Sequence, residues 1–320
     1  MSRHRIRYTL EYLLYRQLTF AATILPRRFA LGFGALVGGF FGLVFAKRSK
    51  LSERNMQLAI PEMSPEQVSS EVKGMFRHLG LLAMDILSFK RFHDEPDLNR
   101  YFDFENLEHL QQAHAGGKGV LILTAHLGNW EGGSCFLPRL GFPTCFIAKK
   151  LKNPQMDAFI KANREQGGAE MIDAKLGARR ILKSLNEGKV ICVLLDQHHR
   201  DGVLVDFFGR PAYTTPVMVQ LAMKTGAPVV PAFTLRTEDN RYTTSFGEPI
   251  QFAPSSSPET LKQYTQQCND LIEAAVRKKP SQWFWLHNRW RHNPAVNAPH
   301  CADLRKASSS EVEAVETAGT

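Results

Sequence analysis

The strongest constraint on the fold is an alternation of short apolar runs with helical segments between residues 120 and 246. Runs rich in β-forming residues predict strands at Val120–Thr124, Thr144–Ala148, Val190–Leu195 and Val229–Leu235. Helical segments lie between them at Pro154–Gly167, Leu176–Asn186 and Thr215–Thr225. Such alternation predicts an α/β fold, a mainly parallel central sheet flanked by helices. We also expect an edge strand at Tyr242–Phe246 and a late helix at Pro258–Lys278.

A long amphipathic helix is predicted ahead of this region. Ser64 is a good N-cap residue, Pro65 suits the first helical position, and Gln67 can complete a capping box. Apolar residues then recur at helical spacing through about Phe92. The apolar stripe indicates that this helix packs against the core, and the alternative that part of it lines an acyl pocket stays open.

The N-terminus carries an uncharged apolar segment, Phe29–Ala46, of 18 residues. A spanning helix needs about 20 apolar residues, so this length is at the lower limit. Basic residues flank both ends: Arg27 and Arg28 before it, and Lys47, Arg48 and Lys50 after it. A signal peptide is disfavoured because no small-residue cleavage site precedes the second basic run. We predict a membrane-anchoring helix that either spans the bilayer or lies in its interface on anionic headgroups.

Three glycines in this segment, Gly34, Gly38 and Gly42, form two overlapping GxxxG steps. Such steps permit close packing of another helix, although they also occur in merely flexible apolar segments. The preceding stretch, Ile6–Leu25, mixes apolar, tyrosine and arginine residues and suits an interfacial amphipathic helix. We therefore divide the chain into an anchoring segment at 1–50, an α/β domain at 51–293 and a small, polar, disordered tail at 294–320.

Composition limits the class of partner. The formal net charge is +9 and the isoelectric point is near 9.4, which favours an anionic partner such as nucleic acid, a phospholipid surface or a phosphorylated substrate. Five scattered cysteines without a CxxC pair argue against a disulfide scaffold or a zinc site. Cys192 lies in an apolar strand and is expected in the core.

The chemistry-bearing feature is His126, which directly follows the strand Val120–Thr124 and its neighbour Ala125. Ligands of open α/β sheets bind at the carboxyl ends of the strands. Glu131 follows five positions later, with Gly128 and Asn129 between. An imidazole oriented by a carboxylate is what a general base needs, whereas a lone histidine is more often structural.

Three other polar segments are expected on the same face of the sheet. The first is the basic loop from Lys149, with Arg164 downstream; the second runs from Asp196 and Gln197 to the loop 207–212; the third is the aromatic and basic run 283–291. No P-loop and no dinucleotide-binding glycine fingerprint is present in the sequence.

Together these segments resemble the lipid A biosynthesis (late) acyltransferase family, the lauroyl/myristoyl acyltransferase group. The resemblance runs from the apolar N-terminus through about Pro294. It rests on the His-x4-Glu motif at 126–131, on Asp196, on the Phe-Gly-Arg-Pro-Ala loop at 208–212 and on the tryptophan-rich segment around 280–290. It implies a glycerolipid-acyltransferase-like fold and a membrane-bound O-acyltransferase activity.

By this resemblance His126 is the general base that deprotonates an acceptor hydroxyl as it attacks an acyl thioester. Glu131 is the carboxylate that holds the imidazole in its tautomer and stabilises the imidazolium. No serine or cysteine nucleophile is then required. Donors for the tetrahedral oxyanion remain open between backbone N–H groups near Gly128 and Asn129 and a nearby arginine.

The resemblance also implies the partners. They are an acidic acyl carrier protein whose thioester (or acyl-CoA) is the donor, a lipid A precursor or related glycolipid as acceptor, and membrane phospholipids; no metal, further cofactor or nucleic acid is expected. Basic side chains would bind phosphate, sugar carboxylate or carrier, and Asp196 would fix the active-site loop or a substrate group. The expected substrate-binding residues are Gly128, Asn129, Lys149, Arg164, Asp196, Gln197 and Arg289.

The implied location is the bacterial inner membrane, with the catalytic domain facing the cytoplasm. Two alternatives stay open: acylation of another phosphoglycolipid or an amino-acid lipid, and a non-catalytic membrane-binding protein. Asn288 stands where family members often carry a second basic residue, and the tandem His198–His199 has no assigned role. The hydroxyl position, the acyl-chain length and the oligomeric state are not determined by the sequence.

Overall fold

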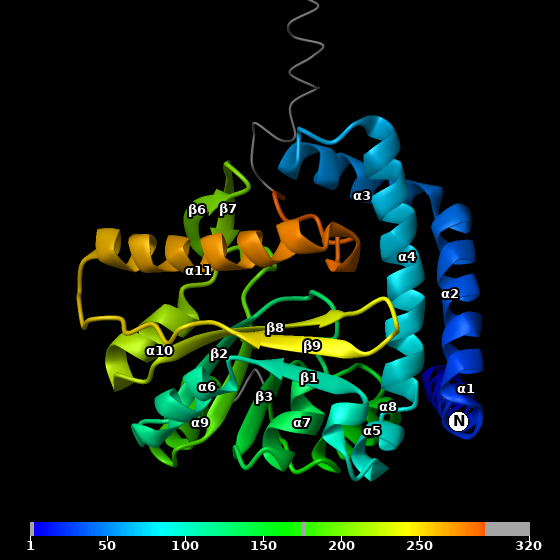
Figure 1. Ribbon diagram of the computed structural model, residues 1–320, viewed down its shortest axis with the longest axis horizontal. Coiled ribbons are helices and arrows are strands. Elements are labelled where there is room, and N and C mark those ends of the chain that lie inside the picture. The colour runs from blue at the N-terminus through cyan, green and yellow to red at the C-terminus, as the bar shows by residue number, and fades with distance from the viewer. Residues whose placement is uncertain (1–2, 174–176, 292–320) are drawn as a thin grey trace, which may run out of the picture.

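A seven-stranded sheet organises the chain, with strand order β1-β9-β8-β2-β5-β3-β4 (Figure 1). The computed structural model describes residues 3–173 and 177–291. The tail at 294–320, predicted to be disordered, and Leu176 lie outside the described residues. The sheet strands are β1 (Phe102–Glu105), β2 (Val120–Thr124), β3 (Thr144–Ala148), β4 (Glu170–Asp173), β5 (Val190–Leu194), β8 (Val229–Arg236) and β9 (Tyr242–Phe246).

All neighbouring strands are parallel except β8 and β9, which confirms the predicted mainly parallel α/β sheet. The prediction that Tyr242–Phe246 is an edge strand is wrong. β9 lies inside the sheet, antiparallel to β8 and parallel to β1. β9 has three buried residues and β1 has one, which fits an interior position for β9 and the edge position for β1.

Helices cover both faces of the sheet and one of its ends. They are α1 (Arg3–Ile24), α2 (Arg27–Val44), α3 (Ala46–Ala59), α4 (Pro65–Leu87), α5 (Lys90–Asp94), α6 (Leu107–Ala115), α7 (Gly133–Arg139), α8 (Pro154–Glu165), α9 (Gly177–Asn186), α10 (Val217–Thr225) and α11 (Pro258–Lys278). Short 3-10 turns lie at Leu98–Arg100 and Pro280–Gln282. The predicted capping box at Ser64 is confirmed, since the Ser64 side chain accepts from the Gln67 N–H and the Ser64 N–H donates to the Gln67 side chain.

Strand β2 has all five residues buried, and its two faces enter different cores. Leu121 and Leu123 pack into a core built with α9, α10, α11 and the C-terminal tryptophans. Val120 and Ile122 pack into a second core with α6 and α7. A strand buried on both faces explains why its sequence is continuously apolar instead of alternating.

Helices α2 and α4 run side by side at one end of the sheet (Figure 1). A Cβ atom on Gly38 would collide with the Phe76 carbonyl oxygen, and one on Gly80 would collide with the Gly34 carbonyl oxygen. The close helix packing predicted from the glycine steps is therefore confirmed, with α4 as the partner. The opposite side of α2 exposes large apolar residues, among them Leu36, Phe40 and Leu43.

Arginine and aspartate side chains anchor the base of α2 to α4 and the sheet. Arg27 donates to both carboxylate oxygens of Asp85, at 2.9 Å each, and Arg236 and the Tyr242 hydroxyl also donate to Asp85. Asp85 is 1% exposed. A buried carboxylate that receives three donors holds its neighbours in one arrangement.

Substitution of Gly80 tests the α2–α4 contact. We expect Gly80→Ala to lower the free energy of unfolding by about 1–3 kcal/mol, because the added methyl forces two backbones apart. Gly32→Ala is the matched control, since nothing lies within 4 Å of a Cβ at Gly32. This variant should be unchanged or up to about 1 kcal/mol more stable. Denaturant unfolding of both variants in one detergent is the measurement, and equal stabilities would contradict the contact.

Candidate active site

The register of two neighbouring strands brings His126 and Asp196 together. β2 and β5 are parallel, with Thr124 opposite Leu194. His126 and Asp196 each come two residues after these positions, so both side chains emerge at the same edge of the sheet. The Asp196 carboxylate accepts from the His126 backbone N–H at 2.9 Å and contacts Nδ1 of the His126 ring at 2.9 Å.

The contacts of Asp196 determine the His126 tautomer. Asp196 is 2% exposed and also accepts from the Trp283 indole N–H at 2.7 Å. Burial raises the pKa of Asp196, but the positive imidazole and the three donated hydrogen bonds outweigh it, and the pKa is lowered. An ionised carboxylate only accepts, so Nδ1 of His126 carries the ring proton. Nε2 is left with a free lone pair.

The His126 imidazole is partly exposed to solvent, and its surroundings raise its pKa. The His126 side chain is 24% exposed. Burial lowers the pKa of His126, but attraction to Asp196, the hydrogen bond to it and the charge of Glu131 together raise the pKa above its ordinary value. The ring lies between Trp130 and Phe284, whose ring centroids are 5.3 and 6.3 Å away.

The predicted hydrogen bond from Glu131 to the imidazole is wrong. Both Glu131 carboxylate oxygens accept from Arg164, at 2.8 and 2.6 Å, in a bidentate ion pair. Asp196 occupies the orienting position instead, since the strand register places it beside Nδ1. Glu131 therefore acts on the His126 ring only through its charge.

The loop after His126 is fixed by its backbone. Gly128 has φ of 60°, and a Cβ there would collide with the Thr234 carbonyl oxygen. The Gly128 N–H donates to the Gln282 carbonyl oxygen, and the Asn129 N–H donates to that of Thr234. Of the candidate oxyanion donors left open by the sequence, these two N–H groups already have backbone partners. Asn129 is 1% exposed.

The Gln197 side chain lies beside Nε2 of His126. Its side-chain nitrogen is 3.3 Å from Nε2 of His126. Since Nε2 carries a lone pair, the amide donates to it. The Gln197 side chain is exposed. Its role in substrate binding stays a prediction.

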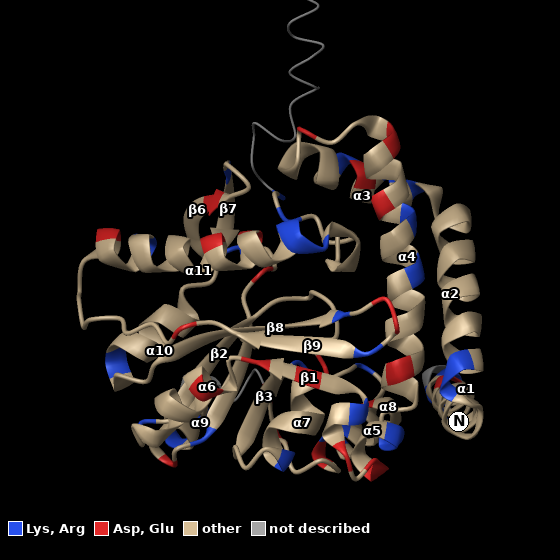
Figure 2. Ribbon diagram, in the orientation of Figure 1, with Lys and Arg blue, Asp and Glu red and all other residues tan. Residues whose placement is uncertain are grey.

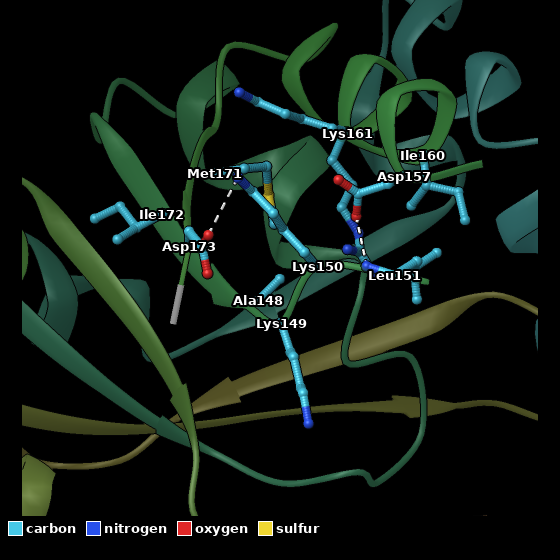
Figure 3. A pocket seen from close by; sticks show the side chains of 11 residues that line it. Ala148, Lys149, Lys150, Leu151, Asp157, Ile160, Lys161, Met171, Ile172 and Asp173 are labelled. Carbon is cyan, nitrogen blue, oxygen red and sulfur yellow. Dashed lines mark hydrogen bonds and ion pairs between the residues drawn. The ribbon is translucent and has the colours of Figure 1, made fainter. Parts of the chain in front are cut away.

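Lys149 and Arg164 line one basic pocket of about 340 Å³ between β3, β4 and α8. Lys150 pairs with Asp173 across 3.3 Å, as Figure 3 shows, while Lys149 is exposed and points away from that pair. The pocket adjoins the loop after His126 through the Glu131–Arg164 ion pair. Its positive side chains suit an anionic group.

Arg289 does not reach this pocket. It is fully buried and donates to the Tyr213 carbonyl oxygen and the Thr214 hydroxyl. Burial lowers the pKa of Arg289 to about 10, against the attraction of Asp196. The prediction that Arg289 binds substrate is corrected: the guanidinium holds the β6–β7 hairpin (Val203–Phe207 and Arg210–Thr214) from inside the core.

The tryptophans of the run 283–291 are part of the core. Trp283, Trp285 and Trp290 are each at most 1% exposed. Trp283 has a role that the sequence did not indicate, since its indole N–H holds the carboxylate that orients His126. Four cysteines in the described residues are buried free thiols, including Cys192 as predicted. Among all residues that the structure describes, no cluster of three or more His, Cys, Asp or Glu side chains suits a metal ion.

Comparison with protein families identifies the class of this site. The model of the bacterial lipid A biosynthesis acyltransferase family matches residues 2–292. The chain belongs to this family. Proteins of this family catalyse acyl transfer, and this chain is an acyltransferase.

Individual relatives of this acyltransferase are distant. It is 27% identical over 276 residues to the lipid A biosynthesis lauroyltransferase of Escherichia coli K12, covering 84% of this chain and 87% of that one. It is 25% identical over 202 residues to the phosphatidylinositol mannoside acyltransferase of Mycolicibacterium smegmatis, covering 62% and 65%. The crystal structure of the 1-acyl-sn-glycerophosphate acyltransferase PlsC of Thermotoga maritima matches at a TM-score of 0.34 with 16% identity, covering 76% of this chain and 96% of that chain.

Proposed function

We propose that this acyltransferase moves a fatty acyl chain from an acyl carrier protein thioester to a hydroxyl of a lipid A precursor, with His126 as general base. The observation that carries the proposal is the hydrogen bond between Asp196 and Nδ1 of His126. It leaves the lone pair of Nε2 at a partly exposed position, where it can accept a hydroxyl proton.

The reaction needs no covalent intermediate on the protein. The acceptor O–H gives its proton to Nε2 of His126 while its oxygen attacks the thioester carbonyl carbon. The tetrahedral intermediate then expels the thiolate as the new ester forms. The imidazolium, stabilised by ionised Asp196, returns the proton to the departing sulfur, so the base is regenerated.

Glu131 is proposed to serve this reaction through Arg164. The bidentate ion pair fixes the guanidinium beside the catalytic loop, where it can stabilise developing negative charge or bind an anionic substrate group. Lys149, exposed in the same pocket, would bind a phosphate of the acceptor or an acidic residue of the carrier.

The proposed location is the bacterial inner membrane, with the catalytic domain towards the cytoplasm. Among the described residues one helix, Arg27–Val44, is long and apolar enough to cross a membrane. Figure 2 shows that α2 carries no Lys, Arg, Asp or Glu between its ends. Basic residues at the α2–α3 corner would rest on phospholipid headgroups.

A second candidate acceptor is a phosphoglycolipid such as a phosphatidylinositol mannoside. The observation that favours it is the similarity to the mycobacterial phosphatidylinositol mannoside acyltransferase. The two acceptors share sugar hydroxyls and phosphate, which are the groups that His126 and the basic pocket would address.

A direct assay tests the proposed function. Detergent-solubilised protein is incubated with acyl carrier protein thioesters or acyl-CoA, and with a tetra-acylated lipid A precursor or a phosphatidylinositol mannoside; mass spectrometry measures the products. We expect one acyl chain to be added to the lipid A precursor from the carrier thioester. Preferred acylation of the mannoside would select the second candidate. Absence of transfer to every lipid acceptor would favour a membrane-binding protein.

A further inference from the structure

An apolar groove of about 490 Å³ lies between α2, α4 and the C-terminal segment. This α2–α4 groove is lined on α2 by Val37, Gly38 and Phe41, at the α2–α3 corner by Phe45 and Arg48, on α4 by Phe76, Leu79, Gly80 and Ala83, and in the C-terminal segment by Phe284, Leu286 and His287. Ligand sites typically occupy about 300–1,000 Å³ and are lined by apolar side chains with a few polar groups. The groove matches this description, and the site described so far makes no use of it.

The groove leads to the catalytic base. Phe284 lines it and also lies 6.3 Å from the His126 ring, while the Phe284 backbone N–H donates to the His126 carbonyl oxygen at 3.0 Å. His287 lines it as well, and its Nε2 accepts from the His198 N–H. Burial lowers the pKa of His287 to about 4, so its ring is neutral and adds no charge to the wall.

The α2–α4 groove opens laterally along helix α2. Phe41 of α2 and Phe45, which directly follows α2, form one wall with stacked rings, and both are about half exposed. At its floor Gly38 and Gly80 mark the place where the backbones of α2 and α4 are in close contact. A lipid that lies beside α2 could therefore place a chain in the groove without moving that chain through water.

One charged side chain lines the groove, and it is positive. Arg48 lies at the α2–α3 corner between the exposed residues Lys47 and Lys50. No Asp or Glu is among the lining residues. This charge suits a ligand with an apolar chain and an anionic head.

We propose that the α2–α4 groove binds an acyl chain of the anionic acceptor lipid, which enters laterally from the bilayer and places its hydroxyl at His126. This inference rests on the proposed function for the identity of the acceptor. The donor chain is the competing occupant, but a carrier protein delivers its thioester from the aqueous side. The basic pocket with Lys149 and Arg164 lies at another side of the catalytic loop and is open to such a carrier.

A photo-crosslinking experiment tests the occupant without relying on turnover. The full chain is reconstituted in vesicles that contain a lipid A precursor with a diazirine in one acyl chain. We expect the label on α4 near Leu79–Ala83 and on the segment 284–286. Ala83→Trp should reduce it about tenfold, which corresponds to about 1.4 kcal/mol of binding, because Ala83 is exposed and an indole there fills the groove without entering the core.

The chain offers a matched control. Ala46 is also exposed and lines a neighbouring groove of about 470 Å³ between α2, α3 and α4, none of whose lining residues contacts His126. Ala46→Trp should leave the labelling unchanged. In steady-state assays, Ala83→Trp should raise KM for the acceptor about tenfold while KM for the donor stays constant, as expected for loss of ground-state acceptor binding.

Three outcomes would overturn the inference. They are labelling confined to residues outside the α2–α4 groove, an equal loss in Ala46→Trp, and a raised KM for the donor with an unchanged KM for the acceptor. Wild-type turnover reports separately on the proposed function. Lipid labelling in the groove without any acyl transfer would therefore support the lipid site while rejecting the activity.

Discussion

His126→Ala is expected to lower kcat for acyl transfer by about 10²–10⁴-fold, the range for removal of a positioned general base. The variant loses the atom that accepts the hydroxyl proton, and the acceptor must then attack as a neutral alcohol. Acylated lipid measured by mass spectrometry, at saturating donor and acceptor, gives kcat directly.

His199→Ala is the matched control for this substitution. His199 is exposed and lies three residues after Asp196 in the same loop. Its replacement should leave kcat within the scatter of the assay, and both variants should unfold at the wild-type temperature. A His126→Ala enzyme with wild-type kcat would refute the proposed mechanism.

Asp196→Asn is expected to lower kcat/KM about 10²–10⁴-fold. The Asp196 carboxylate accepts hydrogen bonds from the His126 backbone N–H, from Nδ1 of His126 and from the Trp283 indole, and an amide cannot accept all three. The asparagine can present an N–H to the ring, which places the ring proton on Nε2 and removes the base. The variant should still fold, as judged by its unfolding temperature, because the side chains have the same shape.

The pH profile of the Asp196→Asn variant gives a second readout with a definite sign. Asp196 raises the pKa of His126 above its ordinary value of 6.5. Wild-type kcat/KM should therefore fall as the pH drops through this raised pKa, because the imidazole becomes protonated. Without the carboxylate the pKa of His126 falls, and the acidic limb should move to lower pH.

Glu131→Gln separates orientation from charge. It removes a nearby carboxylate but leaves the hydrogen bond to Nδ1 intact. We expect a smaller shift of the acidic limb than in Asp196→Asn, since Glu131 contributes the smallest of the charge effects on His126. A larger shift in Glu131→Gln would restore Glu131 as the orienting carboxylate.

The strands that precede His126 and Asp196 could be predicted from the sequence because β2 is buried throughout and β5 in four of its five residues, which makes their sequences continuously apolar. Val120–Thr124, Thr144–Ala148 and Tyr242–Phe246 have the predicted bounds. The strands β1 and β4 were not predicted, since each has four residues and mixes apolar with acidic side chains. The β6–β7 hairpin was not predicted either, because its turn places Phe208 at φ of 55°, a conformation that phenylalanine rarely adopts.

Most residues of the site could be predicted from the sequence, but not which side chains contact each other. The sequence indicated His126 as the base and placed Asp196, Gln197 and Arg164 near it. It paired His126 with Glu131 because those two are close in the chain. The true partner is 70 residues away and becomes visible only through the register of β2 and β5, in which both residues follow their strand by the same number of positions. Burial of Arg289 depends on tertiary packing, which a local pattern does not contain.

The Asp85 cluster has a consequence for where chemistry takes place relative to a bilayer. Arg27 fixes the base of α2 to Asp85 on α4, and His78 on the same helix contacts the Gly128 carbonyl oxygen at 3.3 Å. The anchor and the loop that carries His126 are thus joined through one helix. With a rise of about 1.5 Å per residue, α2 is about 27 Å long. Under the proposed function, an embedded α2 would fix the height of Nε2 of His126 above the lipid, and only hydroxyls at that height would react.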